Sequence, residues 1–362
     1  MVLGTLAGVK YKGKIYFSAA NTNGLFCFDA LCNKTELVTV FKEEKIEILL
    51  HNQAFLYDNK MWLIPAYARK IACVDLITYD ISYFDVPSLE TSGCDHLLFK
   101  NAFAYNSSIY MISDCLNNVV KIDTRESNVI EVCKLNDLQK NNGKMVFVDN
   151  NDIIIWGSDG NIKAKVNQDN CDISEYGNDS FSTENDYLSF LHYKNEILFI
   201  PAGSDKIKAV LLQNKSEKFI SLPEKRDAFY NGLRTNEGAI MFPNENTREY
   251  VVCNWDSLNI SIKDIGIGND DHLVFDKIAG VKMQAISSDQ GYWASSINGF
   301  VFEFSSMGDI INKYIVEMET DVLQKRLDTY YKENNVSIGF GGEGTNEIEG
   351  FGLEKLIDFI SK

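Results

Sequence analysis

Two histidines of this 362-residue sequence follow an aspartate in a repeated phrase. The phrase reads CDHLLF at 94–99 and DDHLVF at 270–275, and it contains Asp95, His96, Asp271 and His272. A histidine beside a carboxylate can act as an acid–base pair or as a metal ligand. The alternative is a repeat-derived Asp–His hydrogen bond that only holds a loop in place. We therefore treat all four residues as catalytic candidates.

The other two histidines stand at different places in the expected strands. His51 opens an expected innermost strand and could point into a central channel, so it is the fifth catalytic candidate. His192 lies one residue from a turn, and we expect a structural role for it.

Tyrosine, arginine and aspartate side chains are frequent in the expected loops. Planar stacking and bidentate hydrogen bonds suit these side chains to a sugar or peptide ligand. Four of the expected ligand-binding residues lie in loops between second and third strands, and three lie in connections between sheets. They are Tyr67, Arg69, Asp114 and Arg248, and Arg226, Tyr230 and Arg234.

Signatures of known catalytic sites are absent from the sequence. It has no phosphate-binding glycine loop, nucleophile elbow, HExxH motif or calcium-loop spacing. The glycine-rich GFGGEG at 339–344 is not framed by the strand–turn–helix unit of a dinucleotide site. We therefore expect no metal and no cofactor, and the sequence leaves open whether the protein is an enzyme.

A repeated phrase positions the candidate residues. It begins as KIYFSAANTNGLFCFD at residue 14 and returns at residues 60, 108, 152, 196, 239 and 292. In the first copy, 14–18 and 25–29 are expected strands separated by a small polar turn. A period of roughly 45 residues with strand-like content throughout is typical of the four-stranded blades of a β-propeller.

Each copy is flanked by two more apolar segments, so each repeat supplies four short strands. Runs such as IIIW at 153–156 are apolar without alternation, as expected for a sheet that is covered on both faces. The predicted fold is therefore an all-β, seven-bladed propeller over residues 1–316. The expected blades are 3–43, 44–88, 89–136, 137–178, 179–223, 224–267 and 268–316.

Residues 317–362 break this pattern and form an expected C-terminal tail. Residues 321–334 have helical spacing after Thr320, which is a suitable N-cap. Residues 336–350 are rich in glycine and acidic side chains, and 351–361 predict a second short amphipathic helix. That helix either caps the ring or docks into a partner groove.

Composition restricts the partners. The net charge of −16 argues against nucleic-acid and anionic-membrane binding, because phosphate groups need a basic patch. The acidity either keeps the chain soluble or forms a recognition surface. No apolar run is long enough to span a membrane, and no signal peptide is visible, so we expect a cytoplasmic protein.

Eight cysteines are spread singly along the chain, without zinc-site spacing. Cys27 and Cys73 occupy equivalent positions in their repeats, as apolar residues would. We expect buried free thiols in a reducing compartment, with disulfides as the alternative.

The phrases GKIYF…GLFCFD and NKMWLIP…IACVD resemble the blades of bacterial kelch-like and other sequence-degenerate β-propellers over residues 3–316. The kelch double glycine and the Trp-Asp pair of WD repeats are both missing. The sequence is also similar to cytoplasmic propellers of gut-type bacteria, a resemblance that implies no particular activity.

Three functions follow from this reading. The first is a binding or scaffold propeller that recognises a protein, peptide or carbohydrate on its loop-rich face. The second is an enzyme, a hydrolase, lyase or cyclase, acting on a sugar or a modified peptide at the channel mouth. The third is a structural subunit that docks through its tail helix.

Overall fold

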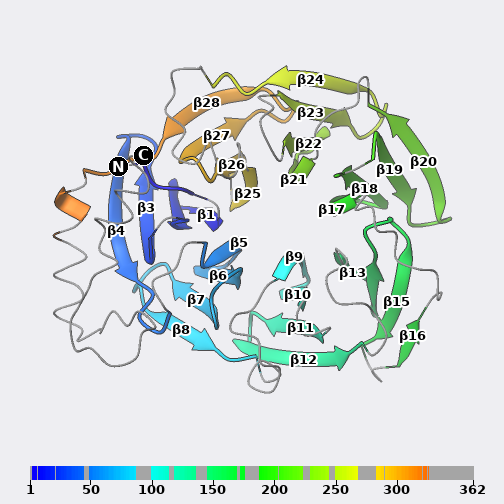
Figure 1. Cartoon of the computed structure of the whole chain (residues 1–362), viewed down its shortest axis with the longest axis horizontal. Coiled ribbons are helices and arrows are strands. Elements are labelled where there is room, and N and C mark those ends of the chain that lie inside the picture. Colours follow the sequence, from blue (N-terminus) through cyan, green and yellow to red (C-terminus); the bar gives the residue numbers. More distant parts are fainter. Residues whose placement is uncertain are drawn as a thin grey trace, which may run out of the picture.

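Short antiparallel sheets form a ring in the computed structural model (Figure 1). The structure describes residues 2–5, 7–20, 22–44, 49–86, 99–113, 118–135, 145–168, 172–175, 187–202, 204–222, 229–243, 249–267, 283–288, 290–319, 321–323 and 325. Nearly all of these residues are in strands or turns, and the short helical stretch lies at 321–323 and 325. The predicted all-β propeller ring is therefore confirmed.

The described strands form five sheets of four strands and one sheet of eight. The first strand of each repeat lies nearest the centre and the fourth lies at the rim (Figure 1). The four-stranded sheets contain the following strands: β5 (His51–Tyr57), β6 (Lys60–Pro65), β7 (Ile71–Asp75), β8 (Ile81–Phe84); β9 (Phe99–Tyr105), β10 (Ser108–Ser113), β11 (Asn118–Asp123), β12 (Asn128–Lys134); β13 (Met145–Asp149), β14 (Asp152–Trp156), β15 (Ile162–Asn167), β16 (Ile173–Glu175); β17 (Tyr187–Tyr193), β18 (Glu196–Pro201), β19 (Lys206–Leu211), β20 (Ser216–Ser221); β21 (Phe229–Arg234), β22 (Gly238–Pro243), β23 (Glu249–Asn254), β24 (Ile260–Asp264).

The eight-stranded sheet joins the two ends of the described ring. Its strands are β1 (Ala7–Tyr11), β2 (Lys14–Ser18), β3 (Gly24–Asp29) and β4 (Lys34–Val40), and β25 (Met283–Ser288), β26 (Tyr292–Ser296), β27 (Phe300–Phe304) and β28 (Ile310–Ile315). The innermost strands β1 and β25 pair in parallel over two residue pairs, Val9 with Ser287 and Lys10 with Ser288. The first and last repeats are thus hydrogen-bonded at the centre.

The residues before β1 add a second closure. Leu3 N donates to Val316 O at 2.9 Å, and Thr5 N donates to Ser296 O at 3.0 Å. Leu3 is fully buried among side chains of the first and last repeats. The residues before β1 are therefore held against the last repeat by backbone hydrogen bonds and by the burial of Leu3.

Alternate side chains of one strand enter different cores, which explains the continuous apolar runs. Along β14, Ile153 and Ile155 pack toward the sheet that contains β10. Ile154 and Trp156 pack toward the sheet that contains β18. Burying each such side chain contributes about 1.5–3 kcal/mol. These runs thus hold neighbouring sheets face to face.

The ring has two faces, which we name by their connections. The connections between sheets and the loops between second and third strands lie on the loop face. For example, Leu49 N donates to Ala20 O at 2.8 Å, and Ala66 N donates to Leu50 O at 2.8 Å. The remaining turns lie on the turn face, because successive strands are antiparallel. Each innermost strand therefore begins at the loop face and ends at the turn face.

The tail is described only at its start. Leu323, in the helical stretch, is fully buried against Val316 and Met318. This agrees with the first residues of the helix predicted for 321–334. The rest of that helix and the expected segments 336–350 and 351–361 lie outside the described residues.

Cys27, Cys32, Cys73 and Cys253 are free thiols. Cys27, Cys73 and Cys253 are buried, and burial raises the pKa of each thiol, to about 12 for Cys73 and Cys253. Because the thiolate is the reactive form, these three should resist alkylation in the folded protein, whereas exposed Cys32 should react readily. Pulse labelling with iodoacetamide at pH 8, with and without urea, followed by peptide mass spectrometry, measures this. Labelling of Cys27 as fast as Cys32 without urea would contradict it.

Candidate functional site

A hollow of about 260 Å³ lies among the innermost strands. Its walls come from β5, β9, β13, β17 and β21, the first strands of the five four-stranded sheets. It is lined by Gln53, Phe55, Asn101, Ala102, Phe103, Ala104, Val146, Ser189, Phe190, Leu191, His192, Asn231 and Arg234. We call it the channel pocket.

The pocket lies away from the place where the ring closes. There, Leu56 N of β5 donates to Ser287 Oγ of β25 at 3.3 Å, and β1 pairs directly with β25. The innermost strands β25, β1 and β5 are thus hydrogen-bonded into one wall. The channel pocket therefore lies on the opposite side of the ring centre, among β5, β9, β13, β17 and β21.

Aromatic side chains form one part of the pocket wall. Phe55, Phe103 and Phe190 are half-buried and line the hollow. Phe103 packs against the buried ring of Phe147 at a centroid distance of 4.9 Å, and Phe190 meets Phe147 edge-on at 5.9 Å. The wall thus offers flat apolar surface on rings that neighbouring rings hold in place.

His192 lies against the same aromatic cluster. Its ring meets Phe147 edge-on at 5.0 Å, and Nε2 donates to Lys194 O at 2.7 Å. Burial is the main cause that lowers the pKa of His192, and the nearby charge of Arg234 lowers it further. At neutral pH the ring is therefore uncharged, with its proton on Nε2.

Arg234 ends β21 at the turn-face end of the pocket. Its Nη1 donates to His192 O at 3.3 Å, and its guanidinium carbon lies 5.9 Å from the ring centroid of Tyr193. Tyr193 in turn stacks on buried Trp255 at 5.1 Å. A backbone carbonyl and a stacked pair of rings thus hold the guanidinium group in a defined position.

Amide side chains join neighbouring innermost strands. Asn52 Nδ2 donates to Phe99 O at 2.6 Å, and Gln53 Oε1 accepts from Ala102 N at 2.9 Å. Asn231 Nδ2 donates to Gln284 Oε1 at 2.6 Å. These bonds satisfy polar groups near the ring centre and keep the strands in register around the pocket.

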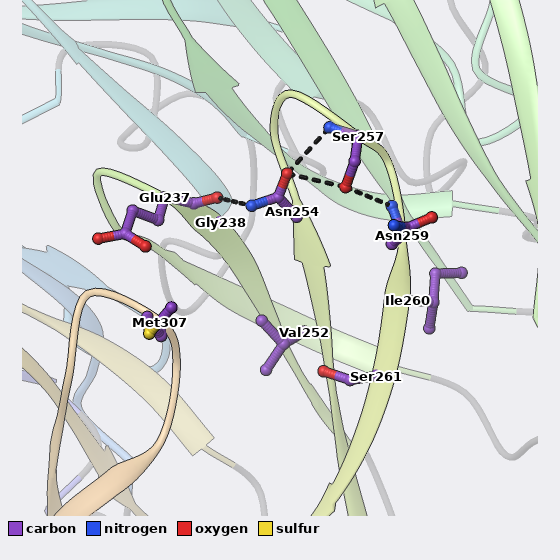
Figure 2. Close-up of a pocket in the computed structure, with 9 residues that line it drawn as sticks. All are labelled: Glu237, Gly238, Val252, Asn254, Ser257, Asn259, Ile260, Ser261 and Met307. Atoms are coloured by element: carbon purple, nitrogen blue, oxygen red, sulfur yellow. Dashed lines mark hydrogen bonds between the residues drawn. The ribbon is translucent and has the colours of Figure 1, made fainter.

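A second hollow of about 310 Å³ lies on the turn face, between turns of two neighbouring sheets (Figure 2). Asn254 Nδ2 donates to Glu237 O at 3.1 Å, and Asn254 Oδ1 accepts from Ser257 N at 2.9 Å and from Ser257 Oγ at 2.9 Å. The Glu237 carboxylate accepts from Ser306 Oγ at 2.8 Å. The polar groups of this hollow thus hold turns together, so we place the candidate site in the channel pocket.

The structure places His51 inside a contact between repeats. It is 2% exposed, shares a 2.9 Å hydrogen bond with Ser18 Oγ through Nδ1, and meets Phe41 edge-on at 4.8 Å. It does begin an innermost strand, as predicted, but its ring packs into the protein and does not line the channel pocket.

Tyr67 and Arg69 lie, as predicted, in a loop between second and third strands. Both are exposed on the loop face. The backbone N–H groups of Arg69 and Lys70 donate to the buried carboxylate of Glu44, each at 2.9 Å. This bond pair fixes the loop to the connection between the first two repeats, and it lies on the opposite face from Arg234.

The placement of Tyr230 and Arg234 in a connection between sheets was wrong. Both belong to β21, and the side chain of Arg234 lines the channel pocket. Gly232 lies between these two residues, and it allows two strands to approach closely. A Cβ at Gly232 would lie 2.6 Å from Ile240 O and 2.8 Å from Ile200.

The other candidates lie outside the described residues: Asp95, His96, Asp114, Arg226, Arg248, Asp271 and His272. Their roles remain predictions. No group of three or more His, Cys, Asp or Glu side chains in the described part of the chain is arranged to hold a metal ion.

Sequence reasoning did not select the residues that line the channel pocket, apart from Arg234. The sequence could have indicated these lining residues. The first strand of each repeat was recognisable, and such strands surround the axis of a propeller. Gln53, Phe55, Phe103 and Phe190 all lie in the apolar segments that precede copies of the repeated phrase, and these segments are the expected first strands. Among the described residues, no helix is long and apolar enough to cross a membrane.

Comparisons with known proteins show the fold and no family. No family model matches the sequence, and no curated protein matches it. Among solved structures, PorZ, described as an essential bacterial surface component of the type-IX secretion system of Porphyromonas gingivalis, matches with TM-score 0.58 and 11% identity. The match covers 88% of this chain and 39% of that one.

Two further structures are similar. The extracellular domain of BT4673 from B. thetaiotaomicron, described as a hybrid two-component system, matches with TM-score 0.58 and 12% identity over 87% of this chain and 42% of that one. A chain of the mitotic checkpoint complex matches with TM-score 0.54 and 8% identity over 84% of both chains. The chain thus spans about two fifths of PorZ and BT4673. At these identities the likeness supports a propeller-type fold alone.

Proposed function

We propose that this protein is a binding module whose ring holds a ligand in the channel pocket. The supporting observation is the pocket itself, where half-buried aromatic rings stand beside polar side chains that their neighbours hold in place. This combination suits a carbohydrate or a peptide segment, because both present flat apolar surface together with hydrogen-bonding groups.

The proposed scaffold is a seven-bladed propeller. Two observations support counting the eight-stranded sheet as two blades. Strands β1–β4 and β25–β28 are each antiparallel and consecutive in sequence, and only the short parallel pairing of β1 with β25 joins them. Closure at the centre then gives the five remaining innermost strands a fixed spacing around the pocket.

The enzyme alternative lacks a supporting observation in the described part of the chain. A carboxylate within hydrogen-bonding reach of a histidine would favour catalysis there. His51 bonds to Ser18, and His192 bonds to a backbone carbonyl. We therefore propose binding, and not turnover, as the function of the channel pocket.

Filling the pocket tests this proposal. Ala104 lines the pocket, so an Ala104→Trp substitution should abolish binding of small ligands, whereas Leu211→Trp, at the exposed end of the third strand β19, should not. Saturation-transfer NMR against a library of mono- and disaccharides, small organic acids and short peptides measures this, with thermal melts to check folding. Ligands that bind the wild type and the folded Ala104→Trp variant equally, or a library without any binder, would contradict the proposal.

A further inference from the structure

The charge of the channel pocket differs from that of the whole chain. The chain carries a net charge of −16, yet none of the described residues that line the pocket is an aspartate or a glutamate. Among these described lining residues, Arg234 is the one that carries a formal charge, because His192 is uncharged at neutral pH. The carboxylate whose charge acts on His192, that of Asp149, is not among these lining residues. The pocket is thus a locally positive place in an acidic protein.

Arg234 keeps most of its hydrogen-bonding capacity. Among the described residues it makes one hydrogen bond, from Nη1 to His192 O, and it pairs with no carboxylate. A guanidinium group has five N–H donors in a planar fork that matches a carboxylate. Its side chain is exposed and lies against Tyr193, so the remaining donors are available to a ligand.

A second donor stands in the same lining. Gln53 is 8% exposed, and its Oε1 is occupied by Ala102 N. This bond orients the amide, and its Nε2 has no hydrogen-bond partner among the described residues. The oxygen of Asn231, by contrast, already accepts from Gly232 N at 2.7 Å. These assignments leave the pocket with spare donors and a favourable potential for negative charge.

Resting on the binding function proposed above, we propose that the channel pocket takes a small monocarboxylate with a flat apolar face. The carboxylate binds Arg234, and an aryl ring or the C–H face of a sugar acid lies on Phe103 and Phe190. The volume of about 260 Å³ is near the lower end of ligand pockets, which are roughly 300–1,000 Å³. The ligand is therefore a single small molecule of one or two rings.

Paired probes test this assignment and separate the two ring types. Phenylacetate is compared with phenylacetamide, and D-glucuronate with D-glucuronamide, by calorimetry at low salt. Changes in the His192 ring signals in ¹H NMR, assigned with His192→Gln, report whether a probe enters the channel pocket. We expect at least one acid to bind about tenfold or more tightly than its amide, because charge-assisted hydrogen bonds are strong.

Substitution of Arg234 then tests whether this residue binds the carboxylate. Arg234→Gln should weaken the acid about tenfold or more and leave the amide unchanged, while Arg234→Lys retains part of the preference. Arg125→Gln, in an exposed turn between third and fourth strands, is the matched control and should have no effect.

Each other outcome is decisive. Equal binding of acid and amide in the channel pocket overturns the carboxylate assignment and leaves the binding function standing. Acid binding that survives Arg234→Gln overturns the role of Arg234. If neither acid shifts the His192 signals, the carboxylate assignment fails, and the library screen with Ala104→Trp judges the binding function separately.

Discussion

Replacing Gly299 by alanine should destabilise the protein by roughly 2–4 kcal/mol. Gly299 lies in the turn between β26 and β27 at φ +80°, where any other residue is strained. A Cβ there would also meet Leu3 O at 2.8 Å and press on the side chain of Val2. The substitution therefore pushes the start of the chain away from the last repeat, where it closes the ring.

Gly13→Ala is the matched control for this substitution. Gly13 has the same φ of +80°, but a Cβ at its position would have no neighbour within 4 Å. Its replacement should cost only the backbone strain, about 1 kcal/mol. Urea unfolding at pH 7.5 measures both variants. Equal losses would show that the close approach of the chain start contributes nothing to stability.

The strands were predictable wherever both faces of a sheet are buried by neighbours. The predicted strand at 14–18 is observed as Lys14–Ser18, and the one predicted at 25–29 is observed as Gly24–Asp29. Such strands carry their signal locally, because each side chain enters one of two cores. The propeller ring follows from repeating that local signal.

The candidate site was less predictable because its features depend on contacts between distant residues. Gly232 must lack a side chain because Ile240 and Ile200, on neighbouring strands, lie close to it, and both are distant from it in the local sequence pattern. The open side of the channel depends on the pairing of β1 with β25, which joins residues from opposite ends of the ring. No local pattern records either contact.

The sequence also did not predict the surroundings of the His51 side chain. Its position at the start of an innermost strand was predicted correctly, but strand position does not tell which way a side chain points. The structure shows the ring between Ser18 and Phe41, in a contact between repeats. This burial leads to the second prediction, which concerns stability and not catalysis.

Acidification from pH 7.5 to pH 5 should destabilise the protein by about 2 kcal/mol through His51 alone. Burial lowers the pKa of His51 to about 3, against 6.5 for an ordinary histidine. Nε2 is buried and has no hydrogen-bond partner among the described residues, so a second N–H on a charged ring would stay unsatisfied. The unfolded chain takes up the proton first, so this contribution is complete above pH 6.5 and is lost as pH falls towards 3.

The His51→Asn variant isolates the contribution of His51 protonation to the pH dependence of stability. Asparagine places an amide group near the position of Nδ1, keeps a partner for Ser18, and does not titrate. The variant should be less stable than the wild type at pH 7.5, because it loses the contact with Phe41. Its free energy of unfolding should nevertheless vary less between pH 6.5 and 5 than that of the wild type.

His192→Asn is the comparison for the other described histidine. The pKa of His192 is also lowered by burial, so its removal should flatten the pH dependence in the same direction, but by less, because its ring is only half-buried. Urea titrations at pH 7.5, 6.5, 5.75 and 5 provide the measurement, and ¹H NMR of the His51 ring gives its pKa directly. A ring that titrates near 6.5, or a His51→Asn variant with the same pH dependence as the wild type, would mean that the His51 environment admits the charged ring.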